Sequence, residues 1–530
     1  MYDLIIIGAG VIGSAIAREI SRYRLNVAVL EKSEEPAFGV SKSNSGIIHP
    51  GTQNRPGTLK GKLCVQGNRL TRMIAKELGI DFKKVGELIV ALDNDELVSL
   101  SDIKREAEAL GVPGLKLVGR AWLKKNEPNL TEEAVGALYA PTAGIISPYR
   151  WVYDLLENAK ANGVEVHTST RVIGIRRVED PLSADRGPRF EKRIAHSAES
   201  KAWVERLYAL CALRYADDRT RTDPGDGGPG TGNYFELATS RGMFRSRFMV
   251  NAAGLYADEV ARMAGIEDFV IYPRKGEEFI LDKKKHNLTR HLIFPIPTKT
   301  SKGILVIRTS DGNPMIGPTA QDVDSKEDLS TSEEGFRRVL ESVKKYVPSI
   351  DENDIIAYFA GLRPASGDDF IIRHEDAFPG MVTVAGMQSP GLTAAPAVAL
   401  FVRDILKKNG LDLRRKPFFR RWRREPYHLF SSSAEAARKM IKEDPAYGDI
   451  VCRCEMVSSK EIREAVRRGA RTLDGIKFRT RAQAGRCHGG FCTARILKIL
   501  AEETGENITS ITKRGRGSEI VVRDMNDGGC

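Results

Sequence analysis

The sequence predicts an α/β fold with more than one domain, and three observations lead to this prediction. Residues 1–31 have the pattern of a strand, a glycine-rich turn, a helix and a second strand. The alternating segment 164–167 and the largely apolar segments 248–254 and 381–385 are typical of further strands, with helical patterns between them. The chain has 530 residues, which at about 150 residues per domain is enough for three or four domains.

The N-terminal unit is the element from which the rest of the fold can be predicted. Leu4–Ile7 is wholly apolar, as is typical of a strand buried on both faces of a parallel sheet. After it, Gly8 permits a tight turn, Gly10 lets a pyrophosphate approach the backbone, and Gly13 lets the helix pack closely on the strand. Glu31 follows the second strand, where a carboxylate can accept hydrogen bonds from a ribose. This combination predicts a dinucleotide site, and an ordinary glycine-rich turn is the weaker alternative.

The charge pattern favours a soluble globular protein over one that binds nucleic acid. The net charge is +12, but the 82 Lys and Arg are interspersed with 70 Asp and Glu. We therefore expect a surface rich in ion pairs and no nucleic acid partner, with a negatively charged small substrate as the second interpretation. No apolar run approaches the roughly 18 residues of a membrane span, and the N-terminus lacks the basic leader of a signal peptide. The sequence thus predicts a cytoplasmic protein without a direct membrane span.

Four of the seven cysteines cluster near the C-terminus. Cys452 and Cys454 form one close pair, and Cys487 and Cys492 form another. Two such pairs can supply the four thiolate ligands of a [2Fe-2S] cluster or of a tetrahedral zinc ion, although a Cys-x-Cys pair is unusual for zinc. We therefore expect a metal centre in a reducing compartment and not a disulfide framework. The other three cysteines have no partner that the sequence identifies: Cys64, Cys211 and Cys530.

The loop after the second strand, residues 38–51, is rich in small residues and carries one histidine. Together with the N-terminal fingerprint, it resembles the FAD-dependent glycerol-3-phosphate dehydrogenases and the related L-2-hydroxyglutarate oxidases of the D-amino-acid-oxidase superfamily. In that family the serine-rich loop runs beneath the flavin, and its histidine faces the substrate. Ser45, Gly46 and His49 are the matching positions. Without the resemblance, His49 would be interpreted as a loop histidine bonded to backbone.

The resemblance covers roughly residues 1–410 and implies a Rossmann-type FAD-binding domain with an interleaved α+β substrate domain. The FAD-binding domain would comprise residues 1–84, 145–265 and 350–410, and the substrate domain residues 85–144 and 266–349. Residues 180–232 depart from the family pattern, because much of this stretch is turn-forming and poor in large apolar groups. They predict a flexible insertion without an assigned function, in which residues 191–215 could form a helix.

The resemblance also implies contacts to the cofactor. The backbone of Val172 would meet the adenine end, and the small residues Ala253 and Gly254 would let the backbone approach closely. The loop 386–393 precedes a helix whose N-terminus would favour the negative charge of reduced flavin. The residues expected to bind FAD are Gly8, Gly10, Gly13, Glu31, Lys32, Ser41, Ser45, Gly46, Val172, Ala253, Gly254, Gly391, Leu392 and Thr393.

The C-terminal part begins with a basic linker, residues 411–445, whose Arg and Lys side chains are mixed with aromatic ones. Such a stretch can bind nucleic acid or an anionic membrane, but we favour a linker whose aromatic side chains dock on the flavin domain. Residues 446–510 resemble the bacterioferritin-associated-ferredoxin-like domain, a helix-turn-helix module that ends the large subunit of anaerobic glycerol-3-phosphate dehydrogenase. The resemblance implies a [2Fe-2S] cluster on the four cysteines, with zinc as the alternative. Residues 511–530 would be a tail.

The flavin loops and the cluster together predict an FAD-dependent dehydrogenase that oxidises a small anionic secondary alcohol. The resemblance implies sn-glycerol 3-phosphate, oxidised to dihydroxyacetone phosphate with hydride transfer to the flavin. His49 is the expected base, since the ordinary pKa of histidine lies near neutral pH. Arg363 is expected to hold the phosphate. Lys275 and Arg308 could help it or could equally be surface cations.

Other functions stay open at this point. L-2-hydroxyglutarate, another 2-hydroxy acid or an amine could be the substrate, because the same flavin scaffold supports them all. The chain could also be an electron-transfer subunit without substrate oxidation of its own, or a nucleic-acid-modifying flavoprotein. The resemblance implies a second flavoprotein or a membrane-anchoring subunit as partner, which would bring the protein to the inner face of the membrane.

Overall fold

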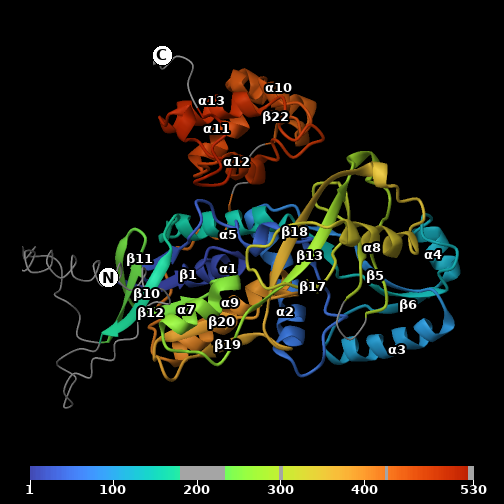
Figure 1. Cartoon of the computed structure of the whole chain (residues 1–530), viewed down its shortest axis with the longest axis horizontal. Coiled ribbons are helices and arrows are strands. Elements are labelled where there is room, and N and C mark those ends of the chain that lie inside the picture. The colour runs from blue at the N-terminus through green and yellow to red at the C-terminus, as the bar shows by residue number, and fades with distance from the viewer. Residues whose placement is uncertain (179–232, 298–301, 424–427, 523–530) are drawn as a thin grey trace, which may run out of the picture.

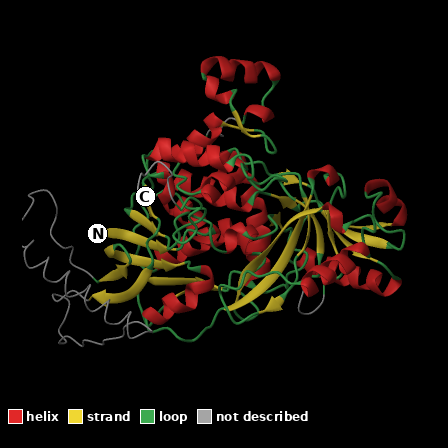
Figure 2. Ribbon diagram, turned by 45° about the horizontal axis from the view of Figure 1, so that its top comes forward, coloured by secondary structure: helices red, strands yellow, loops and turns green. Residues whose placement is uncertain are grey.

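The computed structural model describes residues 1–178, 233–297, 302–423 and 428–522. The predicted insertion 180–232, with its possible helix and Cys211, lies outside the described residues, as does Cys530. The described residues form two large sheets side by side, and a small helical domain stands on one side of them (Figure 1, Figure 2). Among the helices described, none has the length and apolar character needed to cross a membrane.

The first sheet has eight strands, and β1 (Tyr2–Ile7) lies near its centre between β12 and β2, parallel to both. Its order is β10-β11-β12-β1-β2-β9, with β20 paired to β12 and β19 paired to β20. The other strands are β2 (Val27–Leu30), β9 (Val164–His167), β10 (Val172–Val178), β11 (Tyr234–Thr239), β12 (Gly242–Asn251), β19 (Ile371–His374) and β20 (Met381–Ala385). Because strands from widely separated stretches of the chain share this sheet, the predicted α/β fold is confirmed.

The central strand is buried on both faces, as its apolar sequence predicts. Leu4 and Ile6 belong to one core, which the helices on that face complete. These helices are α1 (Val11–Ile20), α2 (Leu59–Leu78), α5 (Pro148–Ala161) and α9 (Gly391–Lys408). Ile5 and Ile7 belong to the opposite core, which α7 (Ala257–Met263) covers. Because successive side chains of β1 point to opposite faces of the sheet, this one strand contributes to both cores.

The second sheet has nine strands and order β17-β13-β16-β15-β14-β5-β7-β6, with β18 paired to β13. Its strands are β5 (Glu87–Ala91), β6 (Lys116–Gly119), β7 (Gly136–Ala140), β13 (Tyr272–Leu281), β14 (Leu292–Phe294), β15 (Leu305–Arg308), β16 (Pro314–Gly317), β17 (Gln321–Asp322) and β18 (Ile355–Ala365). The helices packed around it are α3 (Asn94–Ala109), α4 (Arg120–Asn126) and α8 (Glu333–Lys344). This sheet interleaves with the first along the chain, as the fold class predicted.

One strand differs from the expected division of the chain. β18 falls in the segment 350–410, which the resemblance assigned to the FAD-binding domain, yet it forms a long antiparallel pair with β13 of the second sheet. A close approach explains its path: a Cβ on Gly361 would lie 2.3 Å from the carbonyl oxygen of Ser43 in the serine-rich loop. β18 therefore belongs to one sheet while it touches the cofactor loop of the other. A small third sheet joins β3 (Ile47–Ile48), β4 (Lys83–Lys84) and β8 (Gly144–Ile145).

The C-terminal domain is small and helical, as predicted. Its elements are α10 (Ala434–Glu443), β21 (Ile450–Cys452), β22 (Val457–Ser458), α11 (Ser459–Arg467), α12 (Leu473–Thr480) and α13 (Thr493–Thr504). A capping box at Ser458 and Glu461 fixes the start of α11. Ile462, Ile476 and Ile496, one from each of the last three helices, are fully buried in its core.

Residues 411–423 of the basic linker lie against the first sheet's helices. Residues 424–427 lie outside the described residues, and the rest of the predicted linker, 428–445, contains α10. Arg421 pairs with Glu77 of α2 at 2.5 Å, and Arg423 pairs with Asp154 and Glu157 of α5. Phe419 lies under the guanidinium of Arg22, 4.4 Å from ring centroid to Cζ, whereas Phe418 and Trp422 are exposed. Residues 411–423 therefore dock mainly through ion pairs, and one of the three aromatic side chains in this stretch takes part.

Candidate functional site

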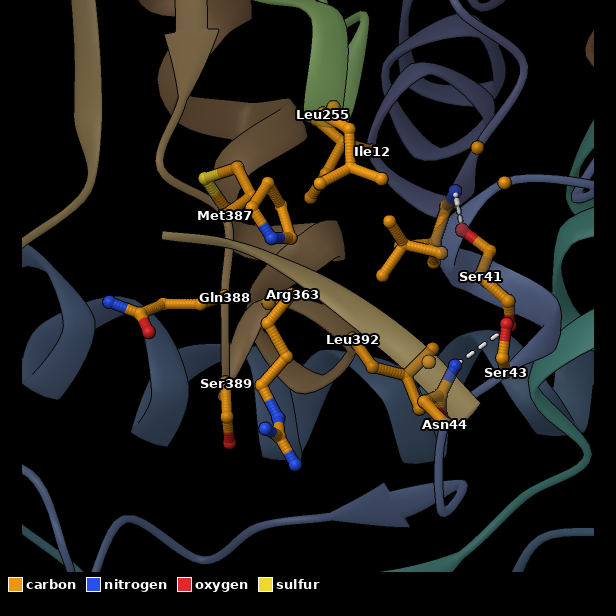
Figure 3. Close-up of a pocket in the computed structure, with 18 of the residues that line it drawn as sticks. Ile12, Ser41, Ser43, Asn44, Leu255, Arg363, Met387, Gln388, Ser389 and Leu392 are labelled. Carbon is orange, nitrogen blue, oxygen red and sulfur yellow. Dashed lines mark hydrogen bonds between the residues drawn. The ribbon is translucent and has the colours of Figure 1, made fainter. Parts of the chain in front are cut away.

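A cavity of about 560 Å³ lies between the two large sheets. The glycine turn after β1, the serine-rich loop, the start of α9 and strands β13 and β18 all contribute to its wall, and Figure 3 shows several of these residues. Most of the predicted cofactor residues line it: Gly8, Gly10, Glu31, Lys32, Ser41, Ser45, Val172, Ala253, Gly254, Gly391 and Leu392. The structure thus brings together residues that lie almost 400 positions apart in the sequence.

The glycine turn is built so closely that side chains would not fit. A Cβ on Gly13 would lie 1.9 Å from the carbonyl oxygen of Gly8, and one on Gly8 would lie 2.5 Å from the oxygen of Ala252. Gly8 also has a φ of +103°, which L-residues rarely adopt. Gly13 does not line the cavity; its role is to let α1 pack against β1. The turn can therefore place the N-terminus of α1 at the cavity wall.

The N-terminus of α1 has no side chain capping it from within the turn, although Val11 N donates to Ser41 Oγ at 2.9 Å (Figure 3). An uncapped helix N-terminus carries N–H groups and partial positive charge that suit a pyrophosphate. Close by, the buried Glu31 carboxylate accepts from Ala9 N at 2.8 Å and from Ser33 N at 2.9 Å. Its remaining lone pairs can still accept from a ribose. Lys32 lies on the ring of Tyr256, 3.3 Å from Nζ to centroid.

The serine-rich loop is held by its own amide side chain. Asn44 donates to the carbonyl of Ser41 at 2.7 Å and accepts from Gly46 N at 2.9 Å. Gly46 has a φ of +70°, and a Cβ there would lie 2.3 Å from the oxygen of Ile146. Gly46 therefore shapes the loop from behind, while Ser45 faces the cavity.

The start of α9 forms the opposite wall. Gly391 and Leu392 line the cavity, and among the described residues no side chain caps this helix, although Gly391 N donates to the carbonyl of Gln388 at 2.7 Å. Thr393 points away: its Oγ1 accepts from His49 N at 2.9 Å and donates to Ile47 O at 3.4 Å. Thr393 thus ties the serine-rich loop to α9 and does not touch the cavity itself.

His49 lies at the far end of the cavity in largely buried surroundings. Its Nε2 is 3.5 Å from Ser389 Oγ, and its Nδ1 is 4.0 Å from Glu87 Oε2. Burial, together with the nearby positive charge of Lys302, holds the pKa of His49 well below its ordinary value. The ring is therefore neutral at neutral pH and can accept a proton.

Glu87 is a buried carboxylate at the start of β5. Its Oε1 accepts from Thr52 Oγ1, whereas Oε2, the atom nearest His49, has no hydrogen-bond partner among the described residues. Burial raises the pKa of Glu87 to about 7, and the Thr52 bond and the charge of Lys302 act against that rise. Sequence reasoning missed this residue because a glutamate at a strand start carries no motif.

Two cations meet at this end of the cavity. Lys302 Nζ and Arg363 Nη1 are buried and have no hydrogen-bond partner in the described part of the chain. Burial lowers the pKa of both groups. The other terminal nitrogen of Arg363 donates to Thr319 O at 3.2 Å, and Figure 3 shows the side chain reaching into the cavity. Buried donors without partners are costly, so these two groups are placed to bind an anion.

Lys302 is a second residue that the sequence did not reveal. It is one of the 82 Lys and Arg in the chain, and nothing in its neighbours marks it. Gln53 adds an uncharged group of the same kind, since its side-chain oxygen and nitrogen are also buried without partners in the described structure. Glu278, a buried carboxylate on β13 near Arg363, has its pKa raised to about 7 by burial.

Two of the cations proposed from the sequence lie elsewhere. Lys275 Nζ binds Asp328 at 2.8 Å and Ser330 at 3.2 Å, and neither Lys275 nor Arg308 is among the described residues of the cavity wall. Alternation along β13 explains this, because Arg274 and Gly276 face the cavity and the residue between them must point the other way. Arg308 is in contact with the carbonyl of Arg290 at 3.4 Å.

The four C-terminal cysteines form a second site. Cys454 Sγ lies 3.5 Å from Cys487 Sγ, and Cys452 is the hydrogen-bonding neighbour of Cys492. That contact with Cys492, together with backbone amides of Gln483, Glu455 and Cys454, lowers the pKa of Cys452 to about 6. In the described residues, no three metal-binding side chains gather as they would around a single ion. The thiols instead stand as two pairs, which fits a two-iron cluster in which each iron takes two thiolates.

Comparison with known proteins identifies the class. The family model of FAD dependent oxidoreductases matches residues 3–198 and 218–405, and the model of the BFD-like [2Fe-2S] binding domain matches residues 450–502. The chain therefore belongs to the FAD-dependent oxidoreductase family and carries a C-terminal BFD-like [2Fe-2S] domain. The predicted resemblance is confirmed, and FAD and [2Fe-2S] are the cofactors of the two matched families.

Individual relatives are more specific. A glycerol 3-phosphate dehydrogenase of Caloramator mitchellensis is 38% identical over 525 residues, 98% of either chain. A glycerol 3-phosphate oxidase of Mycoplasma pneumoniae is 30% identical over 421 residues, 78% of this chain and 96% of that one. The FAD-bound structure of L-alpha-glycerophosphate oxidase from Mycoplasma pneumoniae superposes with a TM-score of 0.67 at 28% identity, covering 81% of this chain and 99% of that one.

Proposed function

We propose that this chain oxidises sn-glycerol 3-phosphate to dihydroxyacetone phosphate and that the electrons leave through the C-terminal cluster. The observation that carries the proposal is the pair of buried donors at one end of the cavity, Lys302 Nζ and Arg363 Nη1, beside the neutral ring of His49. A phosphate would satisfy both donors. The names of the relatives that match nearly the whole chain, or three quarters of it, support the same substrate.

The protein's part in the reaction follows from these side chains. Arg363 and Lys302 hold the phosphate, which orients the middle carbon of the substrate. His49 takes the proton of the C2 hydroxyl, because its lowered pKa keeps the ring unprotonated at neutral pH. Bound FAD supplies the acceptor for the C2 hydride. Glu87 lies on the far side of the imidazole at 4.0 Å and favours the positive charge that the ring gains with the proton.

The residues that would hold FAD fall into three groups. The glycine turn and the N-terminus of α1 face the pyrophosphate, Glu31 faces a ribose, and the N-terminus of α9 faces the ring system. This assignment follows the order of the groups along the cavity wall. It predicts that loss of the glycine turn removes FAD without touching the substrate residues.

The first experiment is the visible spectrum of anaerobically purified protein before and after addition of sn-glycerol 3-phosphate. We expect flavin and iron-sulfur absorbance at the start and loss of the flavin band on mixing. Absorbance without any bleaching would contradict the proposed substrate. Flavin absorbance without iron-sulfur absorbance, in protein that contains zinc, would favour the zinc alternative at the four cysteines.

A second candidate substrate is L-2-hydroxyglutarate. L-2-hydroxyglutarate dehydrogenase of Salmonella houtenae is 28% identical over 441 residues, 74% of this chain and 90% of that one. The two unpaired donors suit a carboxylate as well as a phosphate. If L-2-hydroxyglutarate bleaches the flavin and sn-glycerol 3-phosphate does not, L-2-hydroxyglutarate is the substrate. If neither compound bleaches the flavin, the chain is better described as an electron-transfer subunit.

We further propose that a second flavoprotein or a membrane-anchoring subunit receives the electrons and brings the protein to the inner face of the membrane. The proposal is supported by the match of residues 450–502 to a BFD-like [2Fe-2S] binding domain, because a [2Fe-2S] cluster can pass electrons to another redox protein. Co-purification of the full chain with a redox partner from its own cells would test it. Recovery of the chain alone, with full turnover to a soluble dye, would count against it.

A further inference from the structure

The C-terminal domain meets the rest of the molecule through α12 and the residue that follows it. Phe478 of α12 lies between two aromatic rings of the first sheet's domain, with centroids 5.9 Å from Phe38 and 4.9 Å from Tyr149. Phe38 stands between Ala37 and Gly39, both of which line the cavity. The aromatic contact therefore reaches from the C-terminal domain to a residue whose two chain neighbours line the cavity, while Phe38 itself is not among the described lining residues.

A buried ion pair lies beside this contact. Arg479 Nη1 is 2.8 Å from Glu35 Oε2, and the two side chains are 5% and 0% exposed. The other oxygen of Glu35 accepts from Arg471 N at 2.8 Å, and the Arg479 guanidinium lies 4.0 Å from the ring centroid of Tyr153. A pair this deeply buried fixes one relative position of the two domains, since breaking either half would leave a buried charge alone.

Arg481 makes a second and wider junction. Its Nη1 donates to Asp311 at 2.9 Å and lies 3.3 Å from the hydroxyl of Tyr149, and its Nε donates to Glu455 at 3.1 Å. Glu455 follows the cluster ligand Cys454 directly. One guanidinium thus joins a turn of the second sheet, the start of α5 and the loop that carries a cluster ligand.

The backbone of Arg481 marks the position as unusual. It ends α12 with a φ of +72°, a left-handed conformation that favours glycine. A non-glycine residue keeps such a conformation when its surroundings hold it there, and such sites gather where function demands them. The contacts of the guanidinium provide that hold.

The loops that carry the cysteines are also tied to the second sheet. His488, next to Cys487, makes a 2.8 Å hydrogen bond from its ring to Ile356 O in β18. Arg486 pairs with Asp282, and Lys283 pairs with Glu455 at 2.8 Å. The cysteine loops therefore contact the domains of both sheets, so the linker is not the only connection between them and the rest of the molecule.

We propose that α12 and Arg481 lock the C-terminal domain in one docked position, so that electrons cross from flavin to cluster within a single chain through the contact of Phe38, Phe478, Tyr149 and Arg481. This inference rests on the proposed function. The substrate's C2–H bond breaks with both electrons leaving as hydride, and its hydroxyl proton goes to His49. Bound FAD would accept the hydride, and since a bound [2Fe-2S] cluster would take one electron at a time, a one-electron redox protein or dye would have to remove the first electron before the second could follow.

The test compares Arg481→Gly with the full-length wild type. Glycine suits the φ of +72°, so the variant removes the junction without straining the backbone. Arg495→Gln is the matched control, because Arg495 pairs with Asp449 inside the C-terminal domain at an exposed site. Phe478→Leu is a second variant that thins the aromatic contact at nearly constant volume.

Two readouts separate docking from catalysis. Hydrogen exchange of the amides of residues 34–42 and 311–313 is expected to be at least tenfold faster in Arg481→Gly and unchanged in Arg495→Gln. In anaerobic stopped flow with sn-glycerol 3-phosphate, flavin bleaching should stay within twofold of wild type, while reduction of the cluster slows at least tenfold. Phe478→Leu should slow the same step by a smaller factor.

Wild-type exchange, or wild-type cluster reduction, in Arg481→Gly would overturn the proposal. So would an equal slowing of flavin bleaching and cluster reduction, because the variant would then act on substrate oxidation. Should sn-glycerol 3-phosphate fail to bleach the wild-type flavin, the proposed function fails, and the exchange measurement still tests the docking because it needs no substrate.

Discussion

The two ends of the cavity differ in which chemical groups form them, backbone at one end and side chains at the other. The cofactor end consists mainly of backbone: glycines without room for a Cβ, two uncapped helix N-termini, and a carboxylate held by amides. The substrate end consists of single side chains from distant loops and strands, several of them buried without hydrogen-bond partners among the described residues. Backbone geometry dictates a spacing in the sequence, whereas a set of isolated side chains dictates none. The first end can therefore be recognised in the sequence, and the second emerges only in the fold.

The largest effect is expected at the substrate end. His49→Asn removes the group that takes the hydroxyl proton, so kcat should fall about 10³-fold, within the range of a lost general base. Flavin content should stay normal, because the cofactor end is untouched. The measurement is the anaerobic bleaching rate per bound flavin as a function of pH. Since the pKa of His49 lies well below its ordinary value, the ring itself should not titrate in the usual histidine range, and the wild-type rate there should fall by no more than the about tenfold expected from protonation of Glu87, whose pKa is about 7. In Glu87→Gln, where that carboxylate cannot titrate, a drop centred near pH 6.5 would contradict the neutral buried ring.

A single substitution at the cofactor end should lower both the stability of the fold and the FAD content. Gly13→Ala forces a methyl group to within 1.9 Å of the Gly8 oxygen, and the overpacking should cost about 3 kcal/mol of unfolding free energy along with most of the bound FAD. Denaturant unfolding and the flavin-to-protein absorbance ratio measure both effects. Gly119→Ala is the control, because a Cβ there meets nothing within 4 Å. Equal stability of the two variants would show that the turn has more room than described.

Lys302→Met tests which cation belongs to the site. Loss of one charge-assisted contact to the phosphate should raise KM for sn-glycerol 3-phosphate about 100-fold, equivalent to about 3 kcal/mol. Lys275→Met is the matched variant, and because Lys275 is already paired with Asp328 it should change KM less than about twofold. Steady-state kinetics with an artificial electron acceptor compares them. The reverse order of effects would restore Lys275 as the substrate cation.

Glu87→Gln gives the smallest expected change in rate and a clear change in stability. Without the carboxylate beside Nδ1, kcat should fall about tenfold. Burial raises the folded-state pKa of Glu87 from 4.5 to about 7, so the wild type loses stability as the pH rises between these values, whereas the variant does not. The variant should gain up to about 3 kcal/mol over wild type between pH 4.5 and 8. Unfolding in urea at several pH values measures this, and a difference independent of pH would refute it.

The same contrast explains how far the sequence could be used. The glycine pattern, Glu31, the serine-rich loop and the cysteine pairs each occupy a spacing that chemistry requires, and the fold class, the family and both cofactors followed from them. His49 and Arg363 were found through the resemblance and lie in the cavity wall. Lys302 and Glu87 were missed because no local pattern separates them from other charged residues. Lys275 was named as a cation that could help Arg363 or lie on the surface, and strand alternation turns it away from the cavity.

The topology of the first sheet also bears on how the chain folds during synthesis. Residues 249–251 of β12 pair with residues 381–383 of β20. This pairing can form only after residues 381–383 have left the ribosome. The C-terminal domain, by contrast, gathers its core from residues 451–511 and depends on contacts that are close in sequence. The last domain made is thus suited to fold fastest, and the first strand made remains unpaired on one side the longest. Chaperone demand should accordingly concentrate on the interval between synthesis of β1 and of β20.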